Sequence, residues 1–100
     1  MNLLILGYRL VLTCFACPEQ YDMHDDEGNI VAYLRLRHGT FAVQCPDVGG
    51  EVVYTAQPKG DGVFHDDERM KYLYAAILAV QEWQIRERYY KPIIGTDYEP

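Results

Sequence analysis

Apolar and polar residues alternate along two neighbouring segments, residues 30–37 and 40–45. This alternation predicts two strands with one buried face. His38-Gly39 between them predicts a two-residue hairpin loop, which pairs Arg37 with Thr40 and fixes the register. The predicted apolar face consists of Ala32, Leu34, Leu36, Phe41, Val43 and Cys45. The opposite face consists of Tyr33, Arg35, Arg37, Thr40, Ala42 and Gln44.

Three further segments have the pattern of strands. The apolar stretch from Leu3 to Thr13 predicts the first strand, in which Gly7 marks a bend or bulge. Residues 20–24 predict a short second strand, and residues 51–56 predict the last one. Between them, Asp25-Asp26-Glu27-Gly28-Asn29 has the composition of a tight turn. A four-residue loop there would place Tyr21 and Met23 on the apolar face.

The second half of the chain predicts one long helix over residues 66–88. Acidic residues open it, and basic residues followed by Pro92 close it. Its sheet-facing stripe is predicted to contain Met70, Leu73, Ala76, Ile77, Val80 and Trp83. A second apolar stripe contains Tyr74, Leu78 and Ile85. It is either a contact for a partner or a second copy, or it is buried by a terminal segment.

These elements predict an α+β fold. An antiparallel meander of four to five strands packs against one long C-terminal helix. The 100 residues are enough for one modest core. We expect one domain over residues 1–92 and an extended or disordered tail over residues 93–100.

The net charge of −6 disfavours non-specific binding to nucleic acids and favours a basic protein partner. The acidic residues Glu19, Asp22, Asp25, Asp26 and Glu27 lie close together in the sequence. They are either solvated groups around a turn or a surface that faces a basic groove of another protein. The spacing of a calcium-binding EF-hand is absent.

Tyr33, Arg35 and Arg37 form a basic patch on the polar face of the sheet. The small residues Thr40 and Ala42 opposite them leave room above the arginines. Guanidinium groups beside an aromatic ring suit a nucleotide or another small anion. Alternatively, the arginines pair with Asp22 or another neighbouring acid.

The three cysteines, Cys14, Cys17 and Cys45, are too few for a disulfide framework and indicate a reducing compartment. The N-terminal segment lacks the features of a signal peptide and is too interrupted to span a membrane, so we expect a cytoplasmic protein. Cys14-x-x-Cys17 with Cys45, completed by His24 or His38, is an alternative as a structural zinc site. The stronger expectation is that Cys45 lies in the core and that the chain carries no metal or cofactor.

Enzymatic chemistry has little support in the sequence. The chain contains no serine, and it lacks the common phosphate-binding and metalloprotease motifs. His65 beside Asp66 could act as an acid–base pair, but it is more typical of a helix cap. We therefore expect a non-enzymatic protein.

The run Y-D-M-H-D-D-E-G-N-I-V-A-Y-L-R-L-R-H-G-T-F-A-V at residues 21–43, after Cys14-x-x-Cys17-Pro18-Glu19-Gln20, resembles small proteins of unknown function encoded by bacteriophages. This resemblance implies an accessory protein that binds and inhibits a host protein. The expected contact residues are Asp22, Asp25, Asp26, Glu27, Tyr74 and Leu78.

Overall fold

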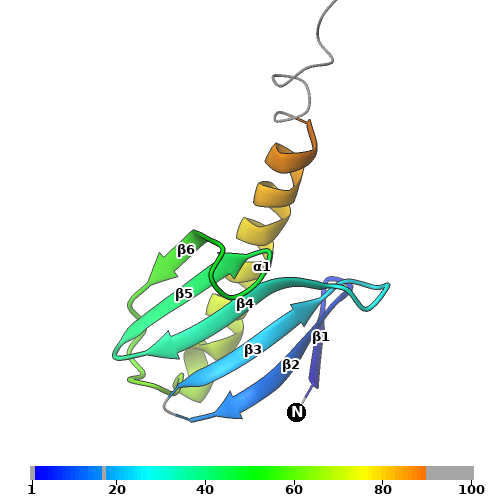
Figure 1. Ribbon diagram of the computed structural model, residues 1–100. Helices are drawn as coiled ribbons and strands as arrows, with labels where there is room; N and C mark the ends of the chain where they lie inside the picture. The colour runs from blue at the N-terminus through cyan, green and yellow to red at the C-terminus, as the bar shows by residue number, and fades with distance from the viewer. Residues whose placement is uncertain (1, 17, 90–100) are drawn as a thin grey trace, which may run out of the picture.

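A single antiparallel sheet and one helix make up the described part of the protein (Figure 1). The computed structural model describes residues 2–16 and 18–89. The strands follow one another in sequence order across the six-stranded sheet. They are β1 (Asn2–Ile5), β2 (Tyr8–Phe15), β3 (Glu19–His24), β4 (Ile30–Arg37), β5 (Thr40–Cys45) and β6 (Glu51–Ala56), and they precede α1 (Asp66–Tyr89). The α+β class is thus confirmed, with six strands in place of the four to five predicted.

The additional strand comes from a hairpin in the segment that we predicted as one strand from Leu3 to Thr13. The chain reverses at Leu6 and Gly7, which have φ angles of 52° and 86°. Ile5 pairs with Tyr8 across this turn. Two central residues with positive φ match the right-handed twist of a hairpin. Gly7 was expected to mark a bend or bulge, but a bulky leucine rarely adopts this conformation, so a full reversal of the chain at Leu6 and Gly7 was not predicted.

The predicted register of the β4–β5 hairpin is confirmed. Arg37 pairs with Thr40 and Arg35 with Ala42, across a turn in which both His38 and Gly39 have positive φ. The turn before β4 occupies residues 25–29 rather than four residues. A register shift after Met23 compensates for the extra residue, so Tyr21 and Met23 still lie in the core.

α1 lies across one face of the sheet and packs against β4, β5 and β6 (Figure 1). Its buried residues are Leu73, Ala76, Ile77 and Val80. Met70, which we predicted in this stripe, is instead 50% exposed. It lies one helical turn before Tyr74 and belongs to the outer stripe. The core side chains of the sheet and its connections are Leu10, Tyr21, Met23, Ala32, Leu34, Leu36, Phe41, Val43, Cys45 and Phe64.

Glu19 connects the start of β3 to the start of α1. It was expected among the solvated acids, but it is 2% exposed. Its carboxylate accepts hydrogen bonds from Arg69 Nε at 2.8 Å, from the Phe64 backbone N–H at 2.9 Å and from the Tyr21 hydroxyl at 2.5 Å. A buried charge with this many partners fixes where the helix begins on the sheet.

Glu68 organises the loop before the helix. Its carboxylate accepts backbone hydrogen bonds from Lys59, Gly60 and His65 at 2.8–3.0 Å. Burial alone would raise the pKa of Glu68, but these three hydrogen bonds outweigh it and lower the pKa. The contact with His65 is one half of a capping box, in which the third helical residue reaches back to the cap.

The face of the sheet that turns away from α1, here called the open face, carries mostly polar and small residues, together with the valines Val11 and Val52. One row across it runs through Val11, Asp22, Tyr33, Gln44 and Val52, and the next through Cys14, Gln20, Arg35, Ala42 and Thr55. At residues 2–16 and 18–89, no helix is long and apolar enough to cross a membrane. The predicted tail, residues 93–100, lies outside the described residues.

Candidate functional site

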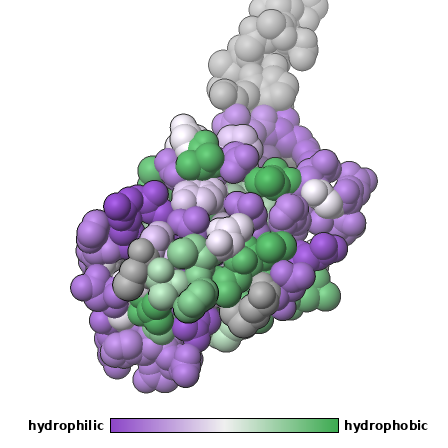
Figure 2. Space-filling model, turned by 60° about the horizontal axis from the view of Figure 1, so that its bottom comes forward, coloured by the Kyte–Doolittle hydropathy of each residue, from purple (hydrophilic) through white to green (hydrophobic). Residues whose placement is uncertain are grey.

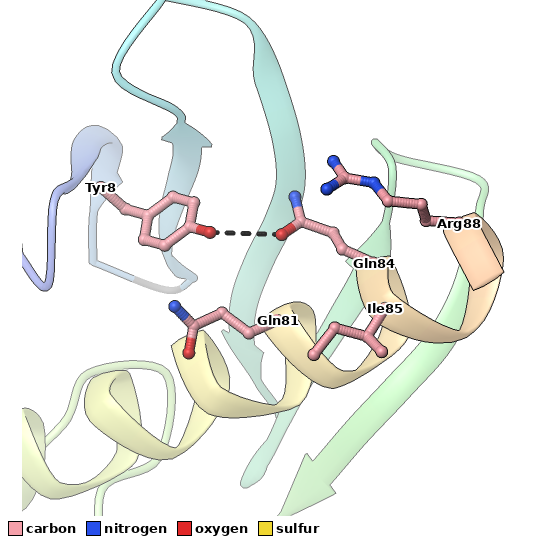
Figure 3. A pocket seen from close by; sticks show the side chains of 5 residues that line it. All are labelled: Tyr8, Gln81, Gln84, Ile85 and Arg88. Atoms are coloured by element: carbon pink, nitrogen blue, oxygen red, sulfur yellow. Dashed lines mark hydrogen bonds between the residues drawn. The ribbon is translucent and has the colours of Figure 1, made fainter.

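A groove runs between the C-terminal half of α1 and the turns that join β1 to β2 and β3 to β4. Three adjoining hollows of about 410, 700 and 260 Å³ form it, and Tyr8 lines all three. The Tyr8 hydroxyl donates a hydrogen bond to Gln84 Oε1 at 3.2 Å, which ties β2 to the helix (Figure 3). Gln81, Ile85 and Arg88 complete the first hollow. The groove is therefore walled by α1 on one side and by strand ends on the other.

The turn between β3 and β4, here called the acidic turn, contains Asp25, Asp26 and Glu27 and forms the second wall of this groove. Asp25, Asp26 and Glu27 line the largest hollow together with Trp83 and Glu87. Among the described residues that line it, Arg88 is the one basic side chain. The wall is consequently negative, and its aromatic groups Tyr8 and Trp83 supply apolar surface for a bound side chain.

Asp25 shapes the acidic turn from within. Its carboxylate accepts hydrogen bonds from the backbone N–H groups of Asn29 and Glu27, each at 2.9 Å. The bond from Asn29 contributes most to lowering the pKa of Asp25. Asp25 thus holds the loop, whereas the exposed side chains of Asp26 and Glu27 are free to meet a partner.

An apolar stripe on α1 leads out of the groove. Tyr74 and Leu78 are each 46% exposed, as expected for the second stripe. Ile85, at the other end of the stripe, lines the groove. Residues three and four apart are neighbours on a helix, so Leu78 adjoins Gln81 and Gln81 adjoins Ile85. Figure 2 shows a further gathering of hydrophobic side chains, bordered by hydrophilic ones, on the side of the molecule that is the bottom of Figure 1, where β1 and β2 form the edge of the sheet.

Asp22, which we grouped with the acidic turn, lies elsewhere. It pairs with Val11 and Tyr33 on the open face of the sheet. It does not line the groove, because its side chain leaves β3 on the face opposite α1. The structure therefore brings Asp25, Asp26 and Glu27 together at the groove but separates Asp22 from them.

The open face brings together the other predicted ligand-binding residues. Tyr33, Arg35 and Arg37 lie on the same face of β4, and the Tyr33 hydroxyl donates to Gln20 Oε1 at 2.9 Å. A hollow of about 210 Å³ is lined by Arg35, Arg37, His38, Thr40 and Ala42. In the described part of the chain, neither arginine pairs with Asp22 or with another acid.

The structure does not assemble the zinc site that was considered as an alternative. Cys14 pairs with Gln20 on the open face, whereas Cys45 is 1% exposed in the core beneath the helix. Cys17 lies outside the described residues. Among residues 2–16 and 18–89, no three His, Cys, Asp or Glu side chains are placed to hold a metal ion. Cys45 therefore has the place of a small hydrophobic core residue.

His65 lies at the start of α1, where its backbone carbonyl accepts hydrogen bonds from the N–H groups of Glu68 and Arg69 at 3.1 Å. This is the helix-cap arrangement rather than an acid–base pair with Asp66, because Asp66 bonds to Arg69 at 2.7 Å. The position of His65 directly before α1 is thus explained by its role as the helix cap.

Sequence reasoning missed Tyr8, Gln84 and the groove between them. These two residues are 76 positions apart, and neither belongs to a motif. The one available signal was Trp83, the single tryptophan of the chain, at the edge of the predicted sheet-facing stripe. It is half-buried, and its indole N–H donates to Glu51 Oε1 at 3.1 Å.

Comparison of the chain with protein-family models, with curated proteins and with solved structures finds no match. The functional interpretation therefore depends on the geometry of the groove and of the open face.

Proposed function

We propose that this protein is a non-enzymatic binding protein whose groove receives a basic segment of another protein. The observation that carries the proposal is the joining of three hollows around Tyr8 into one groove with an acidic wall. Lysine or arginine side chains of the partner would face Asp26 and Glu27. Apolar side chains of the same segment would contact Trp83, Ile85 and Leu78.

Charge supports this occupant over a second copy of the chain. The protein has a net charge of −6, and the groove has the same sign, so two copies would repel each other there. A basic segment gains attraction both at long range and at the acidic wall. The resemblance to small bacteriophage-encoded proteins makes a protein of the host cytoplasm the expected partner, which binding would inhibit.

Trp83 provides the test, because it is the only tryptophan and it lines the groove. A short amphipathic peptide of lysine and leucine, free of aromatic residues, is titrated into the protein while Trp83 fluorescence is recorded. We expect a saturable change in fluorescence, and no change with the matched peptide of glutamate and leucine.

Two single charge reversals locate the binding. Glu27→Lys removes a carboxylate from the groove, whereas Asp67→Lys makes the same change of charge at the far end of α1. We expect Glu27→Lys to weaken binding of the lysine and leucine peptide about fivefold, since one exposed ion pair contributes up to about 1 kcal/mol. Asp67→Lys should leave the affinity nearly unchanged. Equal weakening by both variants would show that only net charge matters and would reject the groove.

A further inference from the structure

Two arginines of β4 stand side by side on the open face, away from the groove. Arg35 and Arg37 are two residues apart on one strand, which places their Cα atoms about 7 Å from each other. Their partners on β5 are the short residues Ala42 and Thr40. The space left above these short side chains is the hollow of about 210 Å³. Two guanidinium groups thus border one small cavity.

No carboxylate of the described residues neutralises these arginines. The neighbours of Arg35 across the sheet are Gln20 and Ala42, which carry no charge. By contrast, Arg69 is bonded to both Glu19 and Asp66. Asp61 lines a separate hollow of about 270 Å³ beyond Arg37 and His38, and it makes no ion pair with Arg37. The cavity therefore keeps a local positive charge on an acidic protein.

The remaining polar groups at the cavity add further hydrogen-bond donors. His38 lies at its rim with a φ of 53°. Thr40 of β5, which pairs with Arg37, also lines the cavity and carries a hydroxyl group. Two guanidinium forks, a hydroxyl and an imidazole form a donor set that suits a phosphate group.

We propose that this cavity is a binding site for the phosphate group of a small molecule, either free pyrophosphate or a nucleotide. Arg35 and Arg37 clamp the phosphate oxygens, and Thr40 and His38 donate from the side. For a nucleotide, the base stacks on Tyr33, which lies next to Arg35 along the same face. The hydrogen bond of Tyr33 to Gln20 at 2.9 Å holds its ring in place.

The size and charge of the surroundings favour a small ligand over a nucleic acid. Neutralising a polynucleotide backbone takes several basic side chains along its path. Here two arginines stand on a protein with a net charge of −6. A mononucleotide brings one phosphate group to the cavity and leaves the rest of the acidic surface untouched.

The test is a titration of the full chain, followed by backbone amide NMR, with inorganic phosphate, pyrophosphate, AMP, adenosine and a short single-stranded oligonucleotide as separate probes. We expect saturable shifts at residues 35–42 with pyrophosphate and AMP, and none with adenosine at the same concentration. Tighter binding of AMP than of inorganic phosphate would assign the nucleotide as the source, because only the base reaches Tyr33. Equal affinities would assign the phosphate group alone.

Matched variants decide whether the arginines are responsible. Arg35→Gln/Arg37→Gln should weaken the binding of pyrophosphate at least a hundredfold, since each charge-assisted contact contributes about a factor of ten or more to the affinity. Arg9→Gln/Arg86→Gln makes the same change of net charge elsewhere and should have little effect. His38→Asn keeps the turn and should weaken binding only severalfold.

Three results would overturn the proposal. They are the absence of saturable shifts at residues 35–42 up to millimolar concentrations, equal weakening by the two arginine double variants, and tighter binding of the oligonucleotide than of AMP at these residues. If Arg35→Gln/Arg37→Gln lost binding but also had an altered amide spectrum, the loss could come from a changed fold. The variant Arg35→Lys/Arg37→Lys then serves as the test. That variant keeps the charge, and it should bind more weakly than the original protein, because lysine lacks the planar fork.

Discussion

Replacing Glu19 by glutamine should destabilise the protein more than any other single change of charge that we consider. The carboxylate is 2% exposed, and it accepts hydrogen bonds from Arg69, Tyr21 and the Phe64 backbone. Glu19→Gln keeps the shape of the side chain but leaves the Arg69 guanidinium without its counter-charge. Breaking a buried ion pair in this way typically costs about 3–5 kcal/mol.

The structure places the cost at the lower end of that range. The Arg69 side chain is 22% exposed, so water partly hydrates its charge after the substitution. We therefore expect a loss of about 3 kcal/mol in the free energy of unfolding. For a domain of this size, that loss corresponds to a decrease in Tm of roughly 12 °C or more.

The dependence of stability on pH follows from the same contacts. Burial alone would raise the pKa of Glu19, but the hydrogen bonds from Arg69, Tyr21 and Phe64 outweigh it and hold the pKa below the ordinary value of 4.5. The stabilisation is thus fully present above pH 4.5 and is lost as the pH falls through the lowered pKa of the folded protein. The unfolding free energies of wild type and Glu19→Gln should converge as the pH decreases below that value.

The assay is urea unfolding, followed by circular dichroism, over a series of pH values. Asp66→Asn is the matched control, because Asp66 bonds to the same arginine at 2.7 Å but its side chain is 96% exposed. This exposed pair should contribute less than about 1 kcal/mol. If Asp66→Asn proved as costly as Glu19→Gln, or if the two curves stayed parallel at low pH, the reasoning about the buried carboxylate would be refuted.

Three further predictions follow from the fold. Leu6→Asn should raise the unfolding free energy by up to about 1 kcal/mol in urea, because asparagine tolerates the positive φ of 52° and Leu6 is already 50% exposed; a clear loss would show that its apolar contacts matter more. Burial and the charge of Glu51 raise the pKa of Cys45 to about 11, so peptide mapping should find Cys45 alkylated only as the protein unfolds. Leu73→Ala should cost about 2–5 kcal/mol in the same urea assay, whereas Leu78→Ala, at a side chain 46% exposed, should cost much less.

The sequence was sufficient where local patterns decide the structure. Alternation in residues 30–45 and the His38-Gly39 turn fixed the register of β4 and β5, and with it the juxtaposition of Arg35 and Ala42. The helical repeat of Leu73, Ile77 and Val80 likewise identified the buried side of α1. These features depend on neighbours in the chain, which a periodic pattern reports directly.

Contacts between segments that are distant in the chain could not be predicted from the sequence. Glu19 looked like one more exposed acid, because its partner Arg69 is 50 positions away. Tyr8 and Gln84 meet only after the sheet has folded against the helix, so no motif announced the groove. The β1–β2 turn was missed for a different reason, since Leu6 occupies a conformation that leucine ordinarily avoids.

The central claim is that the groove around Tyr8 receives a basic segment of a partner. Backbone amide NMR during titration with the lysine and leucine peptide tests it most directly. The claim predicts saturable shifts at residues 6–8, 25–28 and 81–88, together with a shift of the Trp83 indole N–H. Saturable shifts confined to other surfaces, or no saturable shifts at all, would contradict it.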